Sequence, residues 1–264
     1  MAAAPLLRIT LLQRASSLDP AENLAALQVV ECEARRSPAP HLVVLPEAFA
    51  RDFGSPGSDV APYAEDLDGP FATRLAELAD RHGFAVLAGM FERSPDPARP
   101  WNTLVLAQPG RVDHYRKIHL YDSFGYRESD RLSAGGTEPV VVDVGGFGVG
   151  LMTCYDLRFP ELGRALIDRG AEVLAVPAAW VAGDRKVHHW RTLAMARAIE
   201  NTAFVAAVGQ PAPRYTGHSL VVSPLGDVLG EVGSGDGLSI TVDLRRDVLE
   251  EARAQNPSLA NRRL

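Results

Sequence analysis

The chain has 264 residues, of which 46% are hydrophobic and 23% are charged, and its formal net charge is −6 at pH 7. Acidic and basic residues are interspersed, so no basic field is expected that would attract nucleic acid or anionic lipid, and a small-molecule partner is favoured. The longest uncharged apolar stretch, residues 173–183, contains a proline and is far shorter than the roughly 20 residues that span a bilayer, so no membrane segment is expected.

Short apolar runs of β type alternate with helical patterns along most of the chain. Pro109-Gly110, Gly145-Gly146 and residues 224–227 have the composition of hairpin turns, so the sheets are expected to be mixed. So many strands imply two sheets or one barrel. The runs cover residues 6–12, 41–45, 84–90, 102–107, 112–116, 140–144, 148–152, 173–176, 204–208, 219–222, 228–231 and 238–242.

Four helices are expected between these runs. Asp19-Pro20-Ala21-Glu22 combines an N-cap, a proline at the first helical position and an acidic first turn, and it begins the first helix. The second ends at Gly83, the third lies between Pro160 and Gly170, and the fourth covers residues 187–201. Each helix has one apolar face and is expected to cover a sheet. Without a repeat or a long linker, residues 1–264 are expected to form a single domain.

The two cysteines, Cys32 and Cys154, are too few for a disulfide framework, and the N-terminus does not have the pattern of a secretory signal. A cytoplasmic location is therefore expected. Cys32 lies in a helical stretch, where packing is the expected role of a thiol. Cys154 instead follows an apolar run and precedes a polar stretch, a position typical of ligand sites in layered α/β folds.

Two further reactive side chains follow apolar runs in the same way, Glu47 and Lys117. Strand ends of one sheet converge, so a carboxylate, an ammonium group and a thiol are expected to share a pocket. In such a pocket Cys154 would be the nucleophile. Glu47 would be its base, with a pKa raised by apolar surroundings, and Lys117 would stabilise an oxyanion together with the backbone N–H that follows Cys154. The alternatives are a solvated Glu47, a surface Lys117 and a Cys154 that only packs.

The local strings around these residues resemble the three signatures of the nitrilase superfamily of carbon–nitrogen hydrolases. The resemblance extends over nearly the whole chain. It rests on Leu45-Pro46-Glu47, Tyr115-Arg116-Lys117-Ile118-His119-Leu120, Cys154-Tyr155-Asp156-Leu157-Arg158-Phe159-Pro160-Glu161-Leu162, Pro177-Ala178-Ala179-Trp180, His189-Trp190, Ala196-Arg197-Ala198-Ile199-Glu200-Asn201, Gly217-His218-Ser219 and Ser223-Pro224-Leu225-Gly226.

The resemblance implies an α/β fold that is a four-layer αββα sandwich of two mixed β-sheets covered by helices. It also implies a homodimer or larger assembly and a Glu-Lys-Cys triad without metal or organic cofactor. On this chain Cys154 would attack the amide carbon, Glu47 would pass the thiol proton to the departing ammonia, and Lys117 would stabilise the tetrahedral oxyanion. A thioester on Cys154 would then be hydrolysed by water that Glu47 activates.

A further glutamate of the family falls on Glu128, where it would position Lys117 and the substrate amide; its alternative is a loop carboxylate paired with Arg127 or Arg131. Residues 102–136 and the string after Cys154 look like the branch of deaminated-glutathione amidases and ω-amidases, which act on linear amides bearing a carboxylate. Arg158 matches a position that binds this carboxylate, and a guanidinium can hold it with two hydrogen bonds. Its alternative is a structural ion pair with Asp156 or Glu161.

The motif residues Tyr155, Ala179 and Trp180 are expected to line the same substrate site. The triad is shared by nitrilases and by N-carbamoyl hydrolases, so these activities remain alternatives, as does a non-catalytic homologue that only binds a small molecule. The segment 51–69 is a candidate rim of the pocket. A metal site is not expected, because His114, His119, His188 and His189 lack zinc-type spacing.

Overall fold

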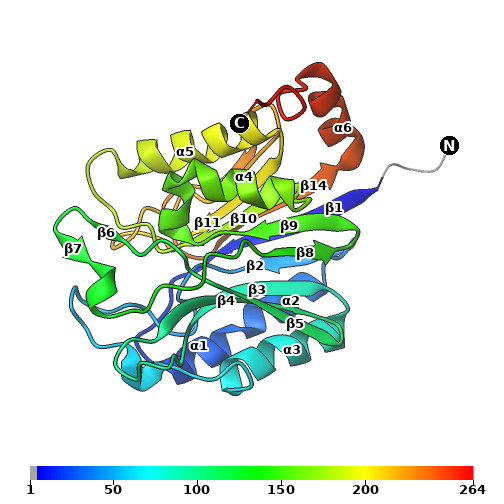
Figure 1. Ribbon diagram of the computed structural model, residues 1–264. Coiled ribbons are helices and arrows are strands. Elements are labelled where there is room, and N and C mark those ends of the chain that lie inside the picture. Colours follow the sequence, from blue (N-terminus) through cyan, green and yellow to red (C-terminus); the bar gives the residue numbers. More distant parts are fainter. Residues whose placement is uncertain (1–4, 264) are drawn as a thin grey trace.

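The structure is a computed structural model that describes residues 5–263, and it contains two six-stranded β-sheets packed face to face (Figure 1). The first sheet has the order β14-β1-β2-β3-β4-β5, in which β1, β2 and β3 are parallel and the other neighbours are antiparallel. Its strands are β1 (Leu6–Gln13), β2 (Leu42–Val44), β3 (Ala85–Glu92), β4 (Trp101–Gln108), β5 (Arg111–Arg116) and β14 (Leu238–Arg245).

The second sheet has the order β13-β12-β11-β10-β9-β8, in which the neighbouring strands β9, β10 and β11 are parallel. The hairpins predicted at Gly145-Gly146 and at residues 224–227 join β8 to β9 and β12 to β13. The strands are β8 (Val141–Val144), β9 (Phe147–Leu151), β10 (Val173–Ala178), β11 (Phe204–Gly209), β12 (Leu220–Val222) and β13 (Val228–Glu231).

Helices cover the outer face of each sheet. On the first sheet lie α1 (Pro20–Ala26), α2 (Gln28–Ala34) and α3 (Pro70–His82). On the second lie α4 (Pro160–Asp168), which contacts β9, and α5 (Lys186–Asn201), which contacts β11. None of the helices within residues 5–263 is long and apolar enough to cross a membrane.

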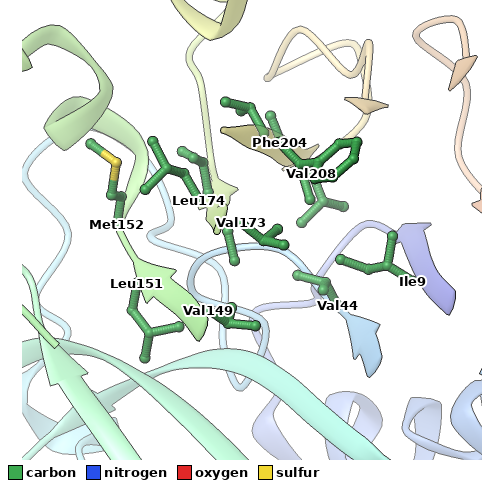
Figure 2. Packing of buried hydrophobic residues seen from close by; sticks show 14 of the residues in the cluster. Ile9, Val44, Val149, Leu151, Met152, Val173, Leu174, Phe204 and Val208 are labelled. Atoms are coloured by element: carbon green, nitrogen blue, oxygen red, sulfur yellow. The ribbon is translucent and has the colours of Figure 1, made fainter. Parts of the chain in front are cut away.

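The alternation of buried side chains explains why the two sheets pack together. In β2, Leu42 and Val44 belong to the core between the sheets, whereas Val43 between them points to the core under α3. Figure 2 shows Ile9 and Val44 of the first sheet beside Val149 and Val173 of the second. Two apolar faces on one sheet require cover on both sides, so the predicted four-layer αββα arrangement is confirmed.

Some local predictions differ from the structure. The first predicted helix is two helices, α1 and α2, separated at Leu27, although the Asp19 side chain does cap it by accepting a hydrogen bond from Ala21 N. The C-terminal helix α6 (Arg246–Gln255) and the small hairpin of β6 (Asp122–Ser123) and β7 (Tyr126–Arg127) were not predicted. The packing role expected of Cys32 is wrong, because this residue is exposed on α2.

Candidate active site

The site lies at the end of the sandwich where the carboxyl ends of strands from both sheets meet. Glu47 follows β2 and Lys117 follows β5 in the first sheet, whereas Cys154 follows β9 in the second. The expectation that one sheet supplies all three is therefore wrong. The parallel strands β10 and β11 end beside β9, and they are followed by Ala179 and Gln210 at the same end.

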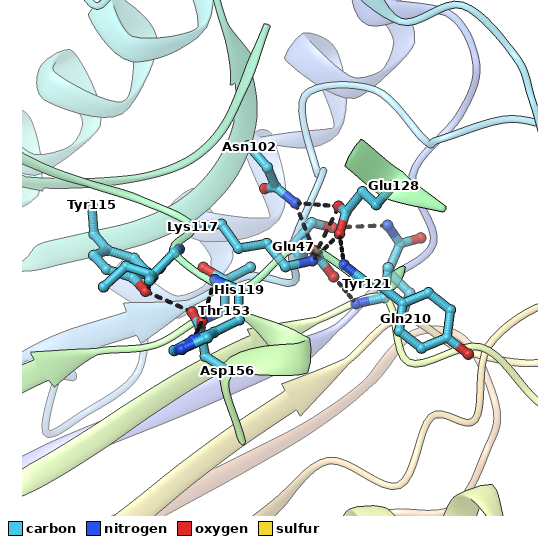
Figure 3. Close-up of polar contacts among 12 residues, drawn as sticks. Glu47, Asn102, Tyr115, Lys117, His119, Tyr121, Glu128, Thr153, Asp156 and Gln210 are labelled. Carbon is cyan, nitrogen blue, oxygen red and sulfur yellow. Dashed lines mark hydrogen bonds and ion pairs between the residues drawn. The ribbon is translucent and has the colours of Figure 1, made fainter. Parts of the chain in front are cut away.

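Lys117 lies between two buried glutamates (Figure 3). Its Nζ is 3.0 Å from Oε1 of Glu47 and 2.9 Å from Oε2 of Glu128. All three side chains are almost completely buried, with 1–3% of each exposed. The predicted alternatives of a solvated Glu47 and a surface Lys117 are thus wrong. So is the alternative for Glu128, a pair with Arg127 or Arg131, because its buried carboxylate pairs with Lys117 and Arg127 pairs with Asp130.

Further hydrogen bonds fix the Glu47 carboxylate in one orientation. Its Oε1 accepts from Asn102 Nδ2 at 2.7 Å, and its Oε2 accepts from the backbone N–H of Ala179 at 2.6 Å. Gln210 Nε2 donates to the Glu47 carbonyl at 2.9 Å. Asn102 is the second residue of β4, an antiparallel strand that begins at this end of the sheet. Asn102 was not among the predicted site residues.

The charges of this cluster change the proton affinity of its members. Burial alone would lower the pKa of Lys117, but the carboxylates of Glu128 and Glu47 raise it well above its usual value, so the side chain is an ammonium ion at neutral pH. Burial also raises the pKa of Glu128, against the opposing effect of Lys117. A fixed positive charge in a dry site is what an oxyanion requires.

Cys154 begins a short 3-10 helix, η3 (Cys154–Arg158), and is 8% exposed. Its φ of 48° is in the left-handed region, which residues with a side chain rarely adopt and which occurs at functional turns. Burial and the negative charge of Glu47 raise the pKa of the Cys154 thiol well above its usual value. The thiol is therefore protonated at neutral pH and needs a base before it can act as a nucleophile.

Asp156 holds the turn that carries Cys154. It is completely buried, and its Oδ2 accepts from the backbone N–H of Thr153 at 2.8 Å and from the Tyr115 hydroxyl at 2.7 Å. Its Oδ1 accepts from the backbone N–H of His119 at 3.1 Å and contacts His119 Nδ1 at 2.8 Å (Figure 3). Tyr115 and His119 flank Lys117, so one carboxylate joins the Lys117 segment to the Cys154 turn.

A pocket of about 730 Å³ opens at this end of the molecule. Every residue predicted for the site lines it, whereas of the expected rim segment, residues 51–69, only residues 53–56 do. Arg158 has its guanidinium carbon 4.8 Å from the centre of the Trp180 ring, and its Nε and Nη2 are buried without a hydrogen-bond partner. The alternative ion pair with Asp156 or Glu161 is not among the salt bridges formed by residues 5–263. The predicted members of the lining are Glu47, Lys117, Glu128, Cys154, Tyr155, Arg158, Ala179 and Trp180.

Some of the pocket walls were not predicted. Lys186 at the start of α5 and Phe124 in the β6–β7 hairpin face it from one side, and Arg214 and Tyr215 face it from another. Lys186 directly precedes the predicted fourth helix, and a charged residue at such a position has no distinguishing pattern in one sequence. Within the described part of the chain, no group of three or more His, Cys, Asp or Glu side chains is placed to hold a metal ion.

The arrangement can support acyl transfer. A buried thiol, a carboxylate fixed beside it and an ammonium ion share one water-poor pocket, and these are a nucleophile, a base and an oxyanion partner.

Comparison with known proteins agrees with this chemistry. Residues 8–254 match the family model described as carbon-nitrogen hydrolase. A Mycobacterium tuberculosis protein named only as a hydrolase is 42% identical, over 97% of this chain and 95% of its own length. The deaminated glutathione amidase of Escherichia coli O157:H7 is 41% identical over 84% of each chain.

Among solved structures, that of XC1258 from Xanthomonas campestris is described as a CN-hydrolase superfamily protein with an arsenic adduct in its active site. It superposes with a TM-score of 0.87 at 32% identity, covering 98% of each chain. The family model, these relatives and the shared fold show that the chain belongs to the carbon–nitrogen hydrolases of the nitrilase superfamily and is an enzyme of that class.

Proposed function

We propose that the protein hydrolyses small linear amides bearing a carboxylate to the acid and ammonia, as an amidase of the deaminated-glutathione amidase or ω-amidase type. The observation that carries this proposal is the presence, in one pocket, of the Glu47–Lys117–Cys154 group and of a guanidinium without a carboxylate partner, that of Arg158. Relatives named deaminated glutathione amidase support the same substrate class.

In the first half of the reaction, Sγ of Cys154 attacks the amide carbon while Glu47 takes the thiol proton. The raised pKa of Cys154 supports a base-assisted attack, because a stored thiolate would need a lowered pKa. The carbonyl oxygen becomes an oxyanion beside the ammonium group of Lys117 and the backbone N–H of Tyr155. Glu47 then gives its proton to the nitrogen, the C–N bond breaks, ammonia leaves and a thioester remains on Cys154.

In the second half, a water molecule takes the place of the ammonia. Glu47 accepts a proton from this water as its oxygen attacks the thioester carbon, and the same oxyanion site stabilises the second tetrahedral intermediate. Collapse breaks the C–S bond, the proton returns from Glu47 to Sγ, and the acid is released. Two donors hold the Glu47 carboxylate in place during both halves of the reaction, namely the backbone N–H of Ala179 and Nδ2 of Asn102.

Arg158 is the proposed anchor for the substrate carboxylate. Its buried, unpartnered Nε and Nη2 are two adjacent donors, which is the geometry that a carboxylate accepts. Trp180 holds the guanidinium plane from one side. Because Arg158 lies in the same 3-10 helix as Cys154, the distance between the anchor and the nucleophile is set by local backbone and selects the length of the substrate.

A substrate panel tests the proposal. Ammonia release is measured with monoamides of four- to six-carbon dicarboxylic acids, with neutral amides of equal length, and with aliphatic nitriles and N-carbamoyl amino acids. We expect the monoamides to have the highest kcat/KM. Arg158→Lys should raise KM for the monoamides about tenfold or more, because lysine cannot donate the two parallel hydrogen bonds of a guanidinium to the substrate carboxylate. The KM for the neutral amides should change little. Equal effects on both would reject the anchor role, and a preference for nitriles or N-carbamoyl compounds would favour the alternative activities.

The family resemblance also leads us to propose a homodimer that acts in the cytoplasm on a small-molecule amide without a cofactor. Light scattering on the purified full chain tests the assembly, because a dimer should have twice the 28.4 kDa mass of the chain. A monomer at micromolar concentration would contradict it.

A further inference from the structure

The charged side chains that line the pocket fall into two groups. In the first group each cation already has an acidic partner. Lys117 is held by Glu47 and Glu128, and Arg214 Nη1 lies 3.0 Å from Oδ1 of Asp52.

The second group consists of Arg158 and Lys186, and within residues 5–263 neither has a carboxylate at salt-bridge distance. Lys186 is only 8% exposed. Its Nζ donates a hydrogen bond to the Tyr121 hydroxyl at 3.0 Å and lies 3.9 Å from the centre of the Phe124 ring. A buried ammonium group with one neutral hydrogen-bond partner retains donors for a ligand.

Arg158 and Lys186 lie against the same aromatic rings. Their cationic groups are 5.9 and 3.9 Å from the centre of the Phe124 ring, and 4.8 and 6.0 Å from that of Trp180. Burial and the charge of Arg158 lower the pKa of Lys186, so the two cations destabilise each other in the free protein. An anion bound between them would remove this repulsion.

The backbone fixes Lys186 in this position. Its carbonyl oxygen accepts a hydrogen bond from Trp180 Nε1 at 3.0 Å, and Lys186 is the first residue of α5. Lys186 is thus hydrogen-bonded to residues of the pocket wall both through its backbone carbonyl and through its ammonium group.

We propose that Lys186 is a specificity-determining residue which, together with Arg158, selects acyl groups whose far end carries a carboxylate and no neighbouring ammonium group. The inference rests on the proposed amidase function and refines its substrate class. A carboxylate at this end gains two cationic partners. An α-ammonium group next to it would face both cations, while the carboxylates of the pocket lining, Glu47 and Glu128, are already bonded to Lys117.

Three amides of one chain length test this inference: pentanamide, the monoamide of glutaric acid, and glutamine. They carry no charge, a carboxylate, and a carboxylate with an adjacent ammonium group, respectively. For the wild type we expect kcat/KM to be highest for the glutaric monoamide and lowest for glutamine. Lys186→Met keeps an unbranched side chain, one atom shorter and without the charge, and should reduce the preference for the monoamide over pentanamide by roughly tenfold, mainly through KM.

Charge reversal is the sharper variant. Lys186→Glu supplies an acceptor for an ammonium group and a partner for Arg158, so the ratio of kcat/KM for glutamine to that for the glutaric monoamide should rise at least about tenfold. Arg185→Asn is the matched control, because it removes a neighbouring exposed positive charge outside the pocket lining and retains a residue that tolerates the left-handed backbone at φ 56°. Arg185→Asn should leave the relative kcat/KM values of the three amides unchanged.

Unchanged substrate ratios in both Lys186 variants would overturn the inference, and so would an equal loss on all three amides, which would indicate a role in folding or chemistry. These outcomes are distinct from failure of the proposed function, in which the wild type itself would hydrolyse none of the three amides.

Discussion

The Tyr115 hydroxyl donates a hydrogen bond of 2.7 Å to Oδ2 of Asp156, and this contact joins the strand that precedes Lys117 to the turn that carries Cys154. Tyr115 lies in β5 of the first sheet and Asp156 in the turn that follows β9 of the second, so the relative position of ammonium group and thiol depends on a buried contact between layers.

Asp156→Asn tests this dependence. Both oxygens of the Asp156 carboxylate accept hydrogen bonds. Whichever oxygen the amide NH2 replaced, it would face an N–H or O–H donor and lose that hydrogen bond. We expect the free energy of unfolding in urea to fall by about 2–3 kcal/mol and kcat to fall by about 100-fold. Tyr115→Phe removes one donor and should cost about 1 kcal/mol. A fully active Asp156→Asn enzyme would show that the contact does not set the geometry of the site.

Glu128→Gln should impair Lys117. Burial lowers the pKa of Lys117, and Glu128 is foremost among the carboxylates that raise it, so Glu128→Gln removes the largest of these opposing charges. The new amide NH2 would also face another donor, either Nζ of Lys117 or the backbone N–H of Tyr121. We expect kcat to fall about 100-fold with a smaller change in KM. Asp130→Asn is the control, because this carboxylate lies in the same 3-10 helix but is exposed and pairs with Arg127. Equal kinetics in the two variants would refute the positioning role of Glu128.

The raised pKa of Cys154 predicts how the thiol reacts with iodoacetamide, which consumes the thiolate. An ordinary thiol is alkylated at half its maximal rate near about pH 8.5, where half of it is thiolate. Burial and the charge of Glu47 raise the pKa of Cys154, so its alkylation, followed by mass spectrometry of its own peptide, should reach half its maximal rate at a clearly higher pH than that of a free cysteine peptide. Glu47→Gln removes one cause of the shift and should move the profile to lower pH. A plateau below pH 8 in the wild type would indicate a stored thiolate instead.

Gly89, which has no side chain, allows the backbone of β3 to lie close to the backbone of Glu47. A Cβ at this position would lie 2.4 Å from Ala48 N and 2.8 Å from the Cα of Glu47. Gly89→Ala should therefore displace Glu47, reduce kcat and destabilise the protein by about 1–3 kcal/mol. Gly136→Ala is the matched substitution, since a Cβ there meets no atom within 4 Å. If both variants had wild-type kcat, the close approach at Gly89 would have no bearing on the position of Glu47.

Much of the fold follows from local patterns. Each predicted strand overlaps a strand of the structure, because alternation or a short apolar run reports burial directly. Elements that bury few apolar side chains were missed for the same reason. In α6 only Leu249 and Ala252 are buried, and β6 and β7 are two residues each.

The site was predictable to the extent that its residues follow strands or match family strings. Glu47, Lys117 and Cys154 have both properties, and the structure places them in one pocket. Asn102 and Lys186 reach the site through contacts between distant segments, Asn102 with Glu47 and Lys186 with Tyr121. The packing of one sheet on the other is also a contact between distant segments. Because local patterns do not report it, the three residues were predicted to converge at the end of one sheet.

In the proposed reaction Cys154 carries the acyl group. Intact-protein mass spectrometry after rapid acid quench, with peptide mapping, should detect an acyl adduct of the glutaric monoamide on Cys154 of the wild type. Cys154→Ala should show neither adduct nor ammonia release while its circular dichroism spectrum stays unchanged. Ammonia release by Cys154→Ala at the wild-type rate, or an adduct on another residue, would contradict the account.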